Sequence, residues 1–471
     1  MRGDCLSVLN HPVVQTPNLD SLARKGVLFK QTYSATPVCI PARAAIMTGL
    51  TQRSHGRVGY QDNVPWNYEV MLPGEFAKAG YHTQCIGKLH VYPSRSLCGF
   101  HNVLLHDGWM HYRNKKTVAR EHWDTVDDYT VWLRQQAGSE VDVMTPGLHW
   151  NSSTTARPWH LREELHPTNW VVTQSIDFLR RRDPLKPFFL WMSFVSPHPP
   201  LNPPQIYFDQ YNQASIPDPP IGDWADKVDS DKNGLDLTTF RGVVQKNRLK
   251  RARAAYYALI THIDEQIGRF LLALNEYGLA EETVILFTSD HGEMLGDHNL
   301  FRKGLPYEGS TKVPFILTDL SGHLGLKPGS TVDESVEMRD ILPTLLHAAD
   351  IPIPDCVEGE SVLPLCRGED AVWREYIHGE HCFGPYSNHY ITNGIEKYIW
   401  FSQTGEEQFF DLQQDPFELQ NMAGEDRYTE RIQLCRQRLV KELFGREEGY
   451  SNGEKLIVGR KPQTCLSHIL S

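Results

Sequence analysis

Two uninterrupted apolar runs, separated by a long amphipathic segment, constrain the fold of this chain most strongly. "PFFLWMSFV" (187–195) and "TVILFTS" (283–289) carry apolar side chains at consecutive positions, so we expect strands that are buried on both faces. Between them, apolar residues recur in steps of three and four within 249–278, which is the period of an amphipathic helix. Strands that alternate with helices predict an α/β fold, with a mostly parallel sheet sandwiched by helices.

The pattern of predicted secondary structure changes near residue 370. "HYITNGIEKYIWFSQTGEEQFFDL" is typical of short antiparallel strands joined by Asn-Gly and Thr-Gly turns, and "DRYTERIQLCRQRLVKELF" of a final amphipathic helix. We therefore predict a larger domain over 1–370 and a small α+β domain over 371–471. The segments 110–165 and 202–247 are predicted to be surface insertions that help to build a substrate pocket.

Composition excludes several classes of protein. A net charge of −11 argues against a nucleic-acid partner, and no apolar run reaches the length of about 18 residues that a transmembrane helix needs. The nine cysteines stand singly, without the CxxC spacing of a zinc site or the even number of a disulfide framework, which favours a reducing compartment. No signal peptide precedes Asp4, so the chain as it stands is predicted to be cytoplasmic.

Polar residues capable of chemistry follow the predicted strands. Ligands of open α/β sheets bind beyond the carboxyl ends of the strands. The residues expected near that edge are Lys88 and His90 in "GKLH", His198 in "SPHPP", Asp290 and His291 in "SDHGE", and Lys303 in "FRKG". Each alone is more often a solvated turn residue, but together they combine cations, imidazoles and a carboxylate at one edge.

"TPVCIPARAAIMTG" (36–49) predicts a short helix that begins near Cys39 and closes at Gly49, with Arg43 one turn inside. Pro41 suits the first turn, where a missing N–H costs little. Amide groups at a helix N-terminus favour anions and acidify a thiol. For a lone cysteine the alternative is a small buried side chain beside a turn. With the strand-end residues, the pattern suits hydrolysis of a tetrahedral oxyanion ester, in which cations hold the oxygens and a metal polarises the ester.

These motifs resemble those of one family. "CIPAR" resembles the C-x-P-[S/A]-R signature of the type I sulfatases (arylsulfatases), which belong to the alkaline-phosphatase-like superfamily. "GKLH" is similar to the family's G-K-W-H motif, "TSDHGEMLGDH" to its metal-binding strand end, and "FRKGLPYEGSTKVPFIL" to the segment with the sulfate-binding lysine. "EKYIWFSQTGEEQFFDLQQDPFELQNMA" resembles the family's C-terminal domain, so the resemblance spans the chain.

The resemblance implies a sulfatase that hydrolyses a small-molecule or sugar sulfate ester. Cys39 would be oxidised to formylglycine by a formylglycine-generating or anaerobic sulfatase-maturing enzyme, and Arg43 would hold its hydrate. Lys88, His90, His198 and Lys303 would surround the sulfate. His198 or Lys303 would protonate the leaving alcohol, and His90 would deprotonate the hydrate. Asp290 and His291 would bind a divalent cation, Ca²⁺ by family analogy, with Mg²⁺ or Mn²⁺ as alternatives.

One departure from the family leaves other interpretations open. Family members begin with a buried strand that ends in an acidic pair just before "RGD", whereas this sequence starts at "MRGDCL". We therefore expect the first domain to lack its first strand and some metal ligands, which leaves a truncated inactive homologue as one alternative. A phosphonate monoester or phosphodiester hydrolase of the same superfamily is another. A periplasmic or secreted location stays open for the same reason.

Overall fold

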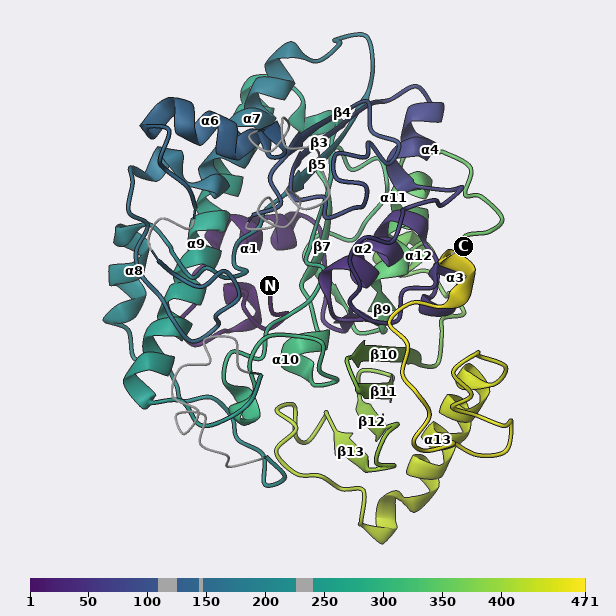
Figure 1. Ribbon diagram of the computed structural model, residues 1–471. Helices are drawn as coiled ribbons and strands as arrows, with labels where there is room; N and C mark the ends of the chain where they lie inside the picture. Colours follow the sequence, from purple (N-terminus) through teal and green to yellow (C-terminus); the bar gives the residue numbers. More distant parts are fainter. Residues whose placement is uncertain (109–124, 144–146, 226–239, 471) are drawn as a thin grey trace.

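The computed structural model describes residues 1–108, 125–143, 147–225 and 240–470, and shows a larger α/β body beside a smaller antiparallel sheet (Figure 1). The strands of the larger body are β1 (Val27–Phe29), β2 (Thr32–Tyr33), β3 (His82–Gly87), β4 (Asn102–Leu105), β5 (Phe188–Ser193), β6 (Val284–Thr288), β7 (Phe315–Asp319), β8 (Ser330–Val332) and β9 (Val336–Glu337). Its helices are α1 (Pro17–Lys25), α2 (Cys39–Thr48), α3 (Gln52–His55), α4 (Leu72–Lys78), α6 (Asp128–Ala137), α7 (Pro167–Arg181), α8 (Gln205–Asn212), α9 (Lys246–Glu276), α10 (Glu308–Thr311), α11 (Ile341–Ala348) and α12 (Leu363–Arg367).

The strands of the larger body form two main groups. In the order β4-β3-β5 all strands are parallel, as the predicted fold requires. In the order β6-β7-β1-β8, β8 is parallel to β1, whereas β7 runs against both β6 and β1. Helices α7, α8 and α9 lie on one side of these strands and α2, α4, α11 and α12 on the other (Figure 1). The α/β class is confirmed, with β7 as an antiparallel strand inside it.

The two apolar runs form β5 and β6, but neither strand is fully shielded from solvent. Trp191 of β5 and Leu286 of β6 pack against one core cluster, whereas Leu190 and Ile285 pack against the cluster on the other side of the strands. All five residues of β6 and the first five of β5 nevertheless stay partly exposed. The reason is their position, because each strand stands at one end of its group of strands.

The helices begin and end at the residues that the sequence indicates. α1 starts at Pro17 and stops before Gly26, and α2 starts at Cys39 and is closed by Gly49 in the left-handed conformation (φ 70°). The amphipathic segment within 249–278 is α9, which has 31 residues. Its apolar stripe, which includes Ile260, Ile263, Ile267, Phe270 and Leu274, is buried. Within the described residues, none of the helices combines the length and the apolar composition needed to cross a membrane.

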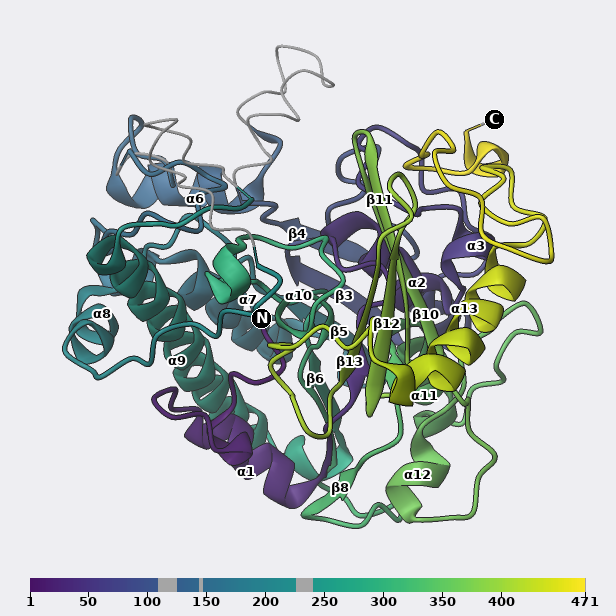
Figure 2. The same cartoon turned by 90° about the horizontal axis from the view of Figure 1, so that it is seen from below.

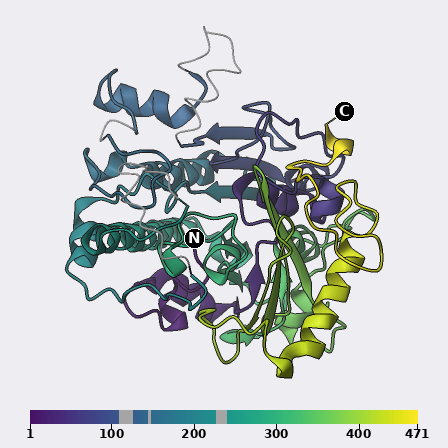
Figure 3. The ribbon, with the colours of Figure 1, turned by 60° about the horizontal axis from the view of Figure 1, so that its bottom comes forward.

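The C-terminal part contains β10 (Ile377–Phe383), β11 (Tyr386–Thr392), β12 (Glu396–Phe401) and β13 (Glu407–Asp411), followed by α13 (Thr429–Leu443). Consecutive strands pair antiparallel, and Gly394 takes a positive φ in the Asn-Gly turn between β11 and β12. α13 covers the outer face of this sheet (Figures 2 and 3). The other face contacts the larger body through residues such as Tyr390. The domain boundary at residue 370 stays a prediction.

The predicted insertions contain regular structure in their described parts. α6 lies within the segment 110–165, and α8 lies within 202–247. Residues 110–124, 144–146 and 226–239 of these segments lie outside the described residues. The role of the insertions in a substrate pocket therefore stays a prediction.

Candidate active site

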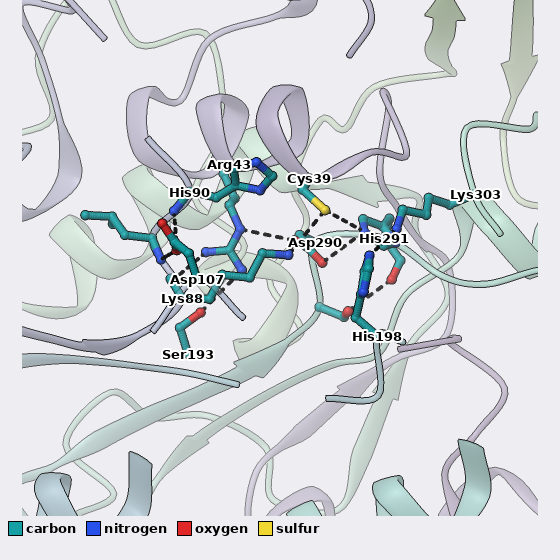
Figure 4. A network of polar contacts seen from close by, with 12 residues as sticks. Cys39, Arg43, Lys88, His90, Asp107, Ser193, His198, Asp290, His291 and Lys303 are labelled. Atoms are coloured by element: carbon teal, nitrogen blue, oxygen red, sulfur yellow. Dashed lines mark hydrogen bonds and ion pairs between the residues drawn. The ribbon is translucent and has the colours of Figure 1, made fainter. Parts of the chain in front are cut away.

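The thiol of Cys39 lies at the centre of a cluster of polar side chains. Cys39 is the first residue of α2, and the extended backbone of Val38 leads the chain into the helix. Its Sγ lies 3.2 Å from Lys88 Nζ and 3.2 Å from His291 Nε2 (Figure 4). Burial raises the pKa of the thiol, but the positive charges of Lys88, His291 and Lys303 outweigh it and lower the pKa well below its ordinary value.

Arg43 connects three of the chain segments that meet here. Its Nε donates to Asp290 Oδ2 at 3.1 Å, one terminal nitrogen donates to the Lys88 carbonyl at 2.9 Å, and the other to Ser193 Oγ at 3.3 Å. The guanidinium thus ties α2 to the carboxyl ends of β3, β5 and β6. These hydrogen bonds are directed to Asp290, Lys88 and Ser193. That Arg43 also holds the oxidised form of Cys39 therefore stays a prediction.

Asp290 and His291 follow β6, where the sequence places a metal site. The His291 Nδ1 lies 2.8 Å from the Gly292 carbonyl, which can only accept, so Nδ1 carries a proton and Nε2 is the ring nitrogen that faces Cys39 Sγ. Burial raises the pKa of Asp290, but the charges of His291, Lys88 and Arg43 hold it well below its ordinary value. Donor atoms of Cys39, Asp290 and His291 all lie within 4.8 Å of one another.

His198 and Lys303 form a direct pair on another side of the cluster. Lys303 Nζ lies 2.6 Å from His198 Nε2, and His198 Nδ1 lies 2.7 Å from the Pro199 carbonyl. Because this carbonyl can only accept, Nδ1 holds the proton and Nε2 accepts from the Lys303 ammonium. Burial and the charges of Lys303 and Lys88 lower the pKa of His198 well below its ordinary value. Burial also lowers the pKa of Lys303.

Asp107 and Ser193 belong to this site although the sequence prediction did not include them. The Asp107 carboxylate accepts the backbone N–H groups of Leu89 and His90, each at 2.9 Å, and so fixes the turn that carries Lys88 and His90. "LLHDG" marks a strand end with an acidic residue, and that signal would have found Asp107. Ser193 is the last residue of β5 and is hidden within its apolar run.

The structure brings the predicted site residues together. Cys39, Arg43, Lys88, Asp290 and His291 are joined by hydrogen bonds or ion pairs, and His198 and Lys303 pair beside them (Figure 4). His90 is anchored through Asp107 in the same cluster. Segments far apart in the sequence contribute to it: Cys39 and His291, for example, are 252 positions apart.

Comparisons with known proteins agree with this geometry. The "Sulfatase" family model matches residues 1–351, and a model of the C-terminal part of N-sulphoglucosamine sulphohydrolase matches 296–444. An arylsulfatase of Clostridium perfringens is 56% identical over 470 residues, covering 100% of this chain and 97% of that protein.

More distant similarity extends to related hydrolases. The multifunctional alkaline phosphatase superfamily protein PehA of Trinickia caryophylli is 28% identical, covering 89% of this chain and 87% of that protein. The crystal structure of a phosphonate monoester hydrolase of Agrobacterium radiobacter superposes with a TM-score of 0.75 at 25% identity, covering 93% of each chain. The fold is therefore alkaline-phosphatase-like. With a cysteine at a helix N-terminus, cations around it and a family model that matches most of its length, the chain belongs to the sulfatase family.

Proposed function

We propose that this sulfatase hydrolyses a small aromatic or sugar sulfate ester at an oxidised Cys39. The observation that carries the proposal is the position of Cys39 Sγ, which is buried at the start of α2 and lies 3.2 Å from both Lys88 and His291. The arylsulfatase of Clostridium perfringens, similar over this whole chain, supports an aromatic ester as the first substrate to test.

The surroundings of Cys39 fit a formylglycine side chain. The hydrate of that aldehyde supplies a hydroxyl nucleophile and a second hydroxyl whose deprotonation releases the sulfate. Ammonium and imidazole groups around Sγ can hydrogen-bond to such oxygens, whereas a purely structural thiol would be surrounded by apolar atoms. The group fits the site that these residues form.

The side chains divide into distinct roles. Lys88 and Lys303 are buried cations that can hold the non-bridging oxygens of a sulfate group. Lys303 holds the proton that the leaving alcohol needs, because His198 is neutral at Nε2 and accepts from Lys303 in the structure. Of the two proposed proton donors, geometry therefore favours Lys303, with His198 orienting it. His90 remains the proposed base that accepts a proton from the oxidised Cys39.

The described residues fit a divalent cation only in part. Asp290 offers one carboxylate and His291 one imidazole nitrogen, whereas Ca²⁺ takes six to eight oxygen ligands. Arg43 also binds Asp290 Oδ2 and neutralises part of its charge. Ca²⁺, with Mg²⁺ or Mn²⁺ as alternatives, therefore stays a proposal that needs further ligands, and we assign it no step of the reaction.

The maturing enzyme is a proposed partner that must act before α2 is packed. All ten residues of α2, including Cys39, Pro41 and Arg43, are buried in the folded chain. A modifying enzyme that reads this sequence therefore cannot reach it in the native state. We expect conversion when the maturing enzyme is present during synthesis, and little conversion when it is added to the purified folded protein.

The deciding experiment compares p-nitrophenyl sulfate with phenyl phosphonate esters, using enzyme coexpressed with a maturing enzyme. We expect a higher kcat/KM for the sulfate ester. The structural similarity to a phosphonate monoester hydrolase makes that activity the second candidate. A preference for the phosphonate ester would overturn the sulfatase assignment in favour of that candidate.

A further inference from the structure

His90 is held in a strained backbone conformation beside Cys39. Its φ of 58° lies in the left-handed region, which non-glycine residues rarely adopt. The Asp107 carboxylate fixes this backbone by accepting the N–H groups of Leu89 and His90. The imidazole is buried, yet within the part of the chain that the structure describes neither ring nitrogen has a hydrogen-bond partner at normal distance. A buried imidazole that lacks partners in a strained turn is arranged for a function that involves something else in the site.

Asp62 is the carboxylate that faces this imidazole. Its Oδ1 lies 3.9 Å from His90 Nε2, and the side chains are only 15% and 7% exposed, respectively. The Tyr60 hydroxyl donates to the same Oδ1 at 3.0 Å, and the Tyr60 ring packs edge-on against His90 at 6.1 Å between centroids. The cavity shared by Asp62 and His90 measures about 20 Å³, which is room for a water molecule.

We infer that Asp62 is a positioning residue that aligns His90 as the base acting on the oxidised Cys39, with Tyr60 fixing the carboxylate. This inference rests on the proposed function. In this arrangement His90 acts as the base on the oxidised Cys39, and the Asp62 carboxylate orients the His90 imidazole. Other enzymes with activated nucleophiles orient their base in the same way.

The charge balance around His90 is consistent with this role. The groups that act on the ring are Asp62, the Cys39 sulfur and Lys88, and Arg57 and Asp107 line the same cavity. Burial lowers the pKa of His90, but Asp62 and Cys39 outweigh it and raise the pKa above its ordinary value. When a hydroxyl of the oxidised Cys39 transfers its proton to His90, the imidazolium is paired with Asp62 instead of standing alone in a buried site.

The test is a double-mutant cycle on p-nitrophenyl sulfate, with turnover expressed per formylglycine measured by mass spectrometry. Asp62→Asn is expected to lower kcat about ten- to a hundredfold while KM stays within twofold, because the carboxylate acts on a proton-transfer step. Asp62→Glu should recover part of the loss. In a His90→Ala background, Asp62→Asn should have no further effect. Asp333→Asn, an exposed carboxylate paired with Lys30, is the matched control.

Several results would overturn the pairing of Asp62 with His90. They are an unchanged kcat in Asp62→Asn, a loss that appears only in KM, or the same fold-loss with and without His90. If Asp62→Asn does not fold, Tyr60→Phe replaces it, and an unchanged kcat in that variant contradicts the inference. A wild-type enzyme that contains formylglycine but hydrolyses no sulfate ester contradicts the proposed function instead, so the two failures are distinct.

Discussion

At the scale of single residues, two of the site's histidines are set in the same way. His198 and His291 each donate from Nδ1 to the carbonyl of the next residue, Pro199 and Gly292. In both, Nε2 is the ring nitrogen that faces the site, toward Lys303 in one case and Cys39 in the other. His90 has no such carbonyl partner and depends on Asp62. One backbone contact per histidine thus fixes a proton on Nδ1 and decides which ring nitrogen faces the site.

The first prediction at this scale concerns the chemical form of Cys39. We expect tryptic mass spectrometry of enzyme coexpressed with a maturing enzyme to show a carbonyl in place of the Cys39 thiol. Cys98, which is buried but lies outside the cluster of cations, should remain a thiol in the same digest. An active preparation that contains only the Cys39 thiol would contradict the proposed chemistry.

The second prediction concerns the Lys303–His198 pair. Lys303→Ala removes a preorganised buried cation and should lower kcat by about 10²–10³. His198→Ala should also lower kcat, because Lys303 then loses the acceptor that orients it. Lys30→Ala, an exposed lysine on the same chain, serves as the control. Near wild-type turnover in both site variants would show that the pair has been wrongly assigned.

At the scale of elements, the site is built where strands end and one helix begins. β3, β5 and β6 each deliver their functional residue at or just after the carboxyl end, and α2 delivers Cys39 at its first position. β5 and β6 also stand at the ends of their groups of strands, with side chains that pack on the same two core clusters. The backbone amino group of Met1 lies just past β6, 2.8 Å from the His291 carbonyl.

This arrangement predicts the effect of adding a strand. A version with an extended apolar segment that ends in Asp before Met1 should place a further carboxylate near Asp290 and His291. An added strand would pair with an exposed strand edge and bury backbone N–H and C=O groups, so the Tm of this version should rise. Ca²⁺ should raise the Tm further, since a ligand that binds only the folded state stabilises it by mass action.

Thermal melting of both versions, with and without Ca²⁺, measures this. The chain as it stands should show little Ca²⁺ stabilisation, because the described residues supply one carboxylate to the ion. A version whose added segment ends in Asn in place of Asp is the control. Equal Ca²⁺ stabilisation of all three would mean that no upstream carboxylate contributes to the site.

At the scale of the whole molecule, a buried lysine joins the C-terminal sheet to the larger body. Lys397 of β12 is fully buried, and its Nζ lies 2.7 Å from Glu308 on α10 and 3.1 Å from Glu418. α10 follows closely after Lys303 in the chain, so this joint borders the segment that carries a proposed sulfate-binding residue. Packing of the C-terminal sheet thereby supports the site.

Replacing this lysine should therefore be costly. Lys397→Met leaves the buried Glu418 without its cation and Glu308 with Lys312 alone, and we expect a loss of about 3–5 kcal/mol in the free energy of unfolding. Urea denaturation measures it, with Lys441→Met on α13 as a control on the surface. A variant that also carries Glu308→Gln and Glu418→Gln should recover part of the loss. Wild-type stability in Lys397→Met would contradict the claim that Lys397 joins the C-terminal sheet to the larger body.

The sequence alone determined the elements and the catalytic motif. The period of α9, the end positions of α1 and α2, and the apolar runs of β5 and β6 follow from local preferences of neighbouring residues. Polar residues that follow the predicted strands indicated which residues meet at the site, because the carboxyl ends of parallel strands lie at one edge of a sheet. The family followed from motifs in the correct order.

Only the tertiary structure decided the rest. That β7 runs antiparallel depends on long-range pairing, which no local pattern records. The places of Ser193, Asp107 and Asp62 depend on side chains from distant segments approaching within a few ångströms. Proton positions on His198 and His291 follow from single carbonyl contacts that form only on folding. Local physics specifies which element a segment forms, whereas directional contacts between segments specify what its side chains can do.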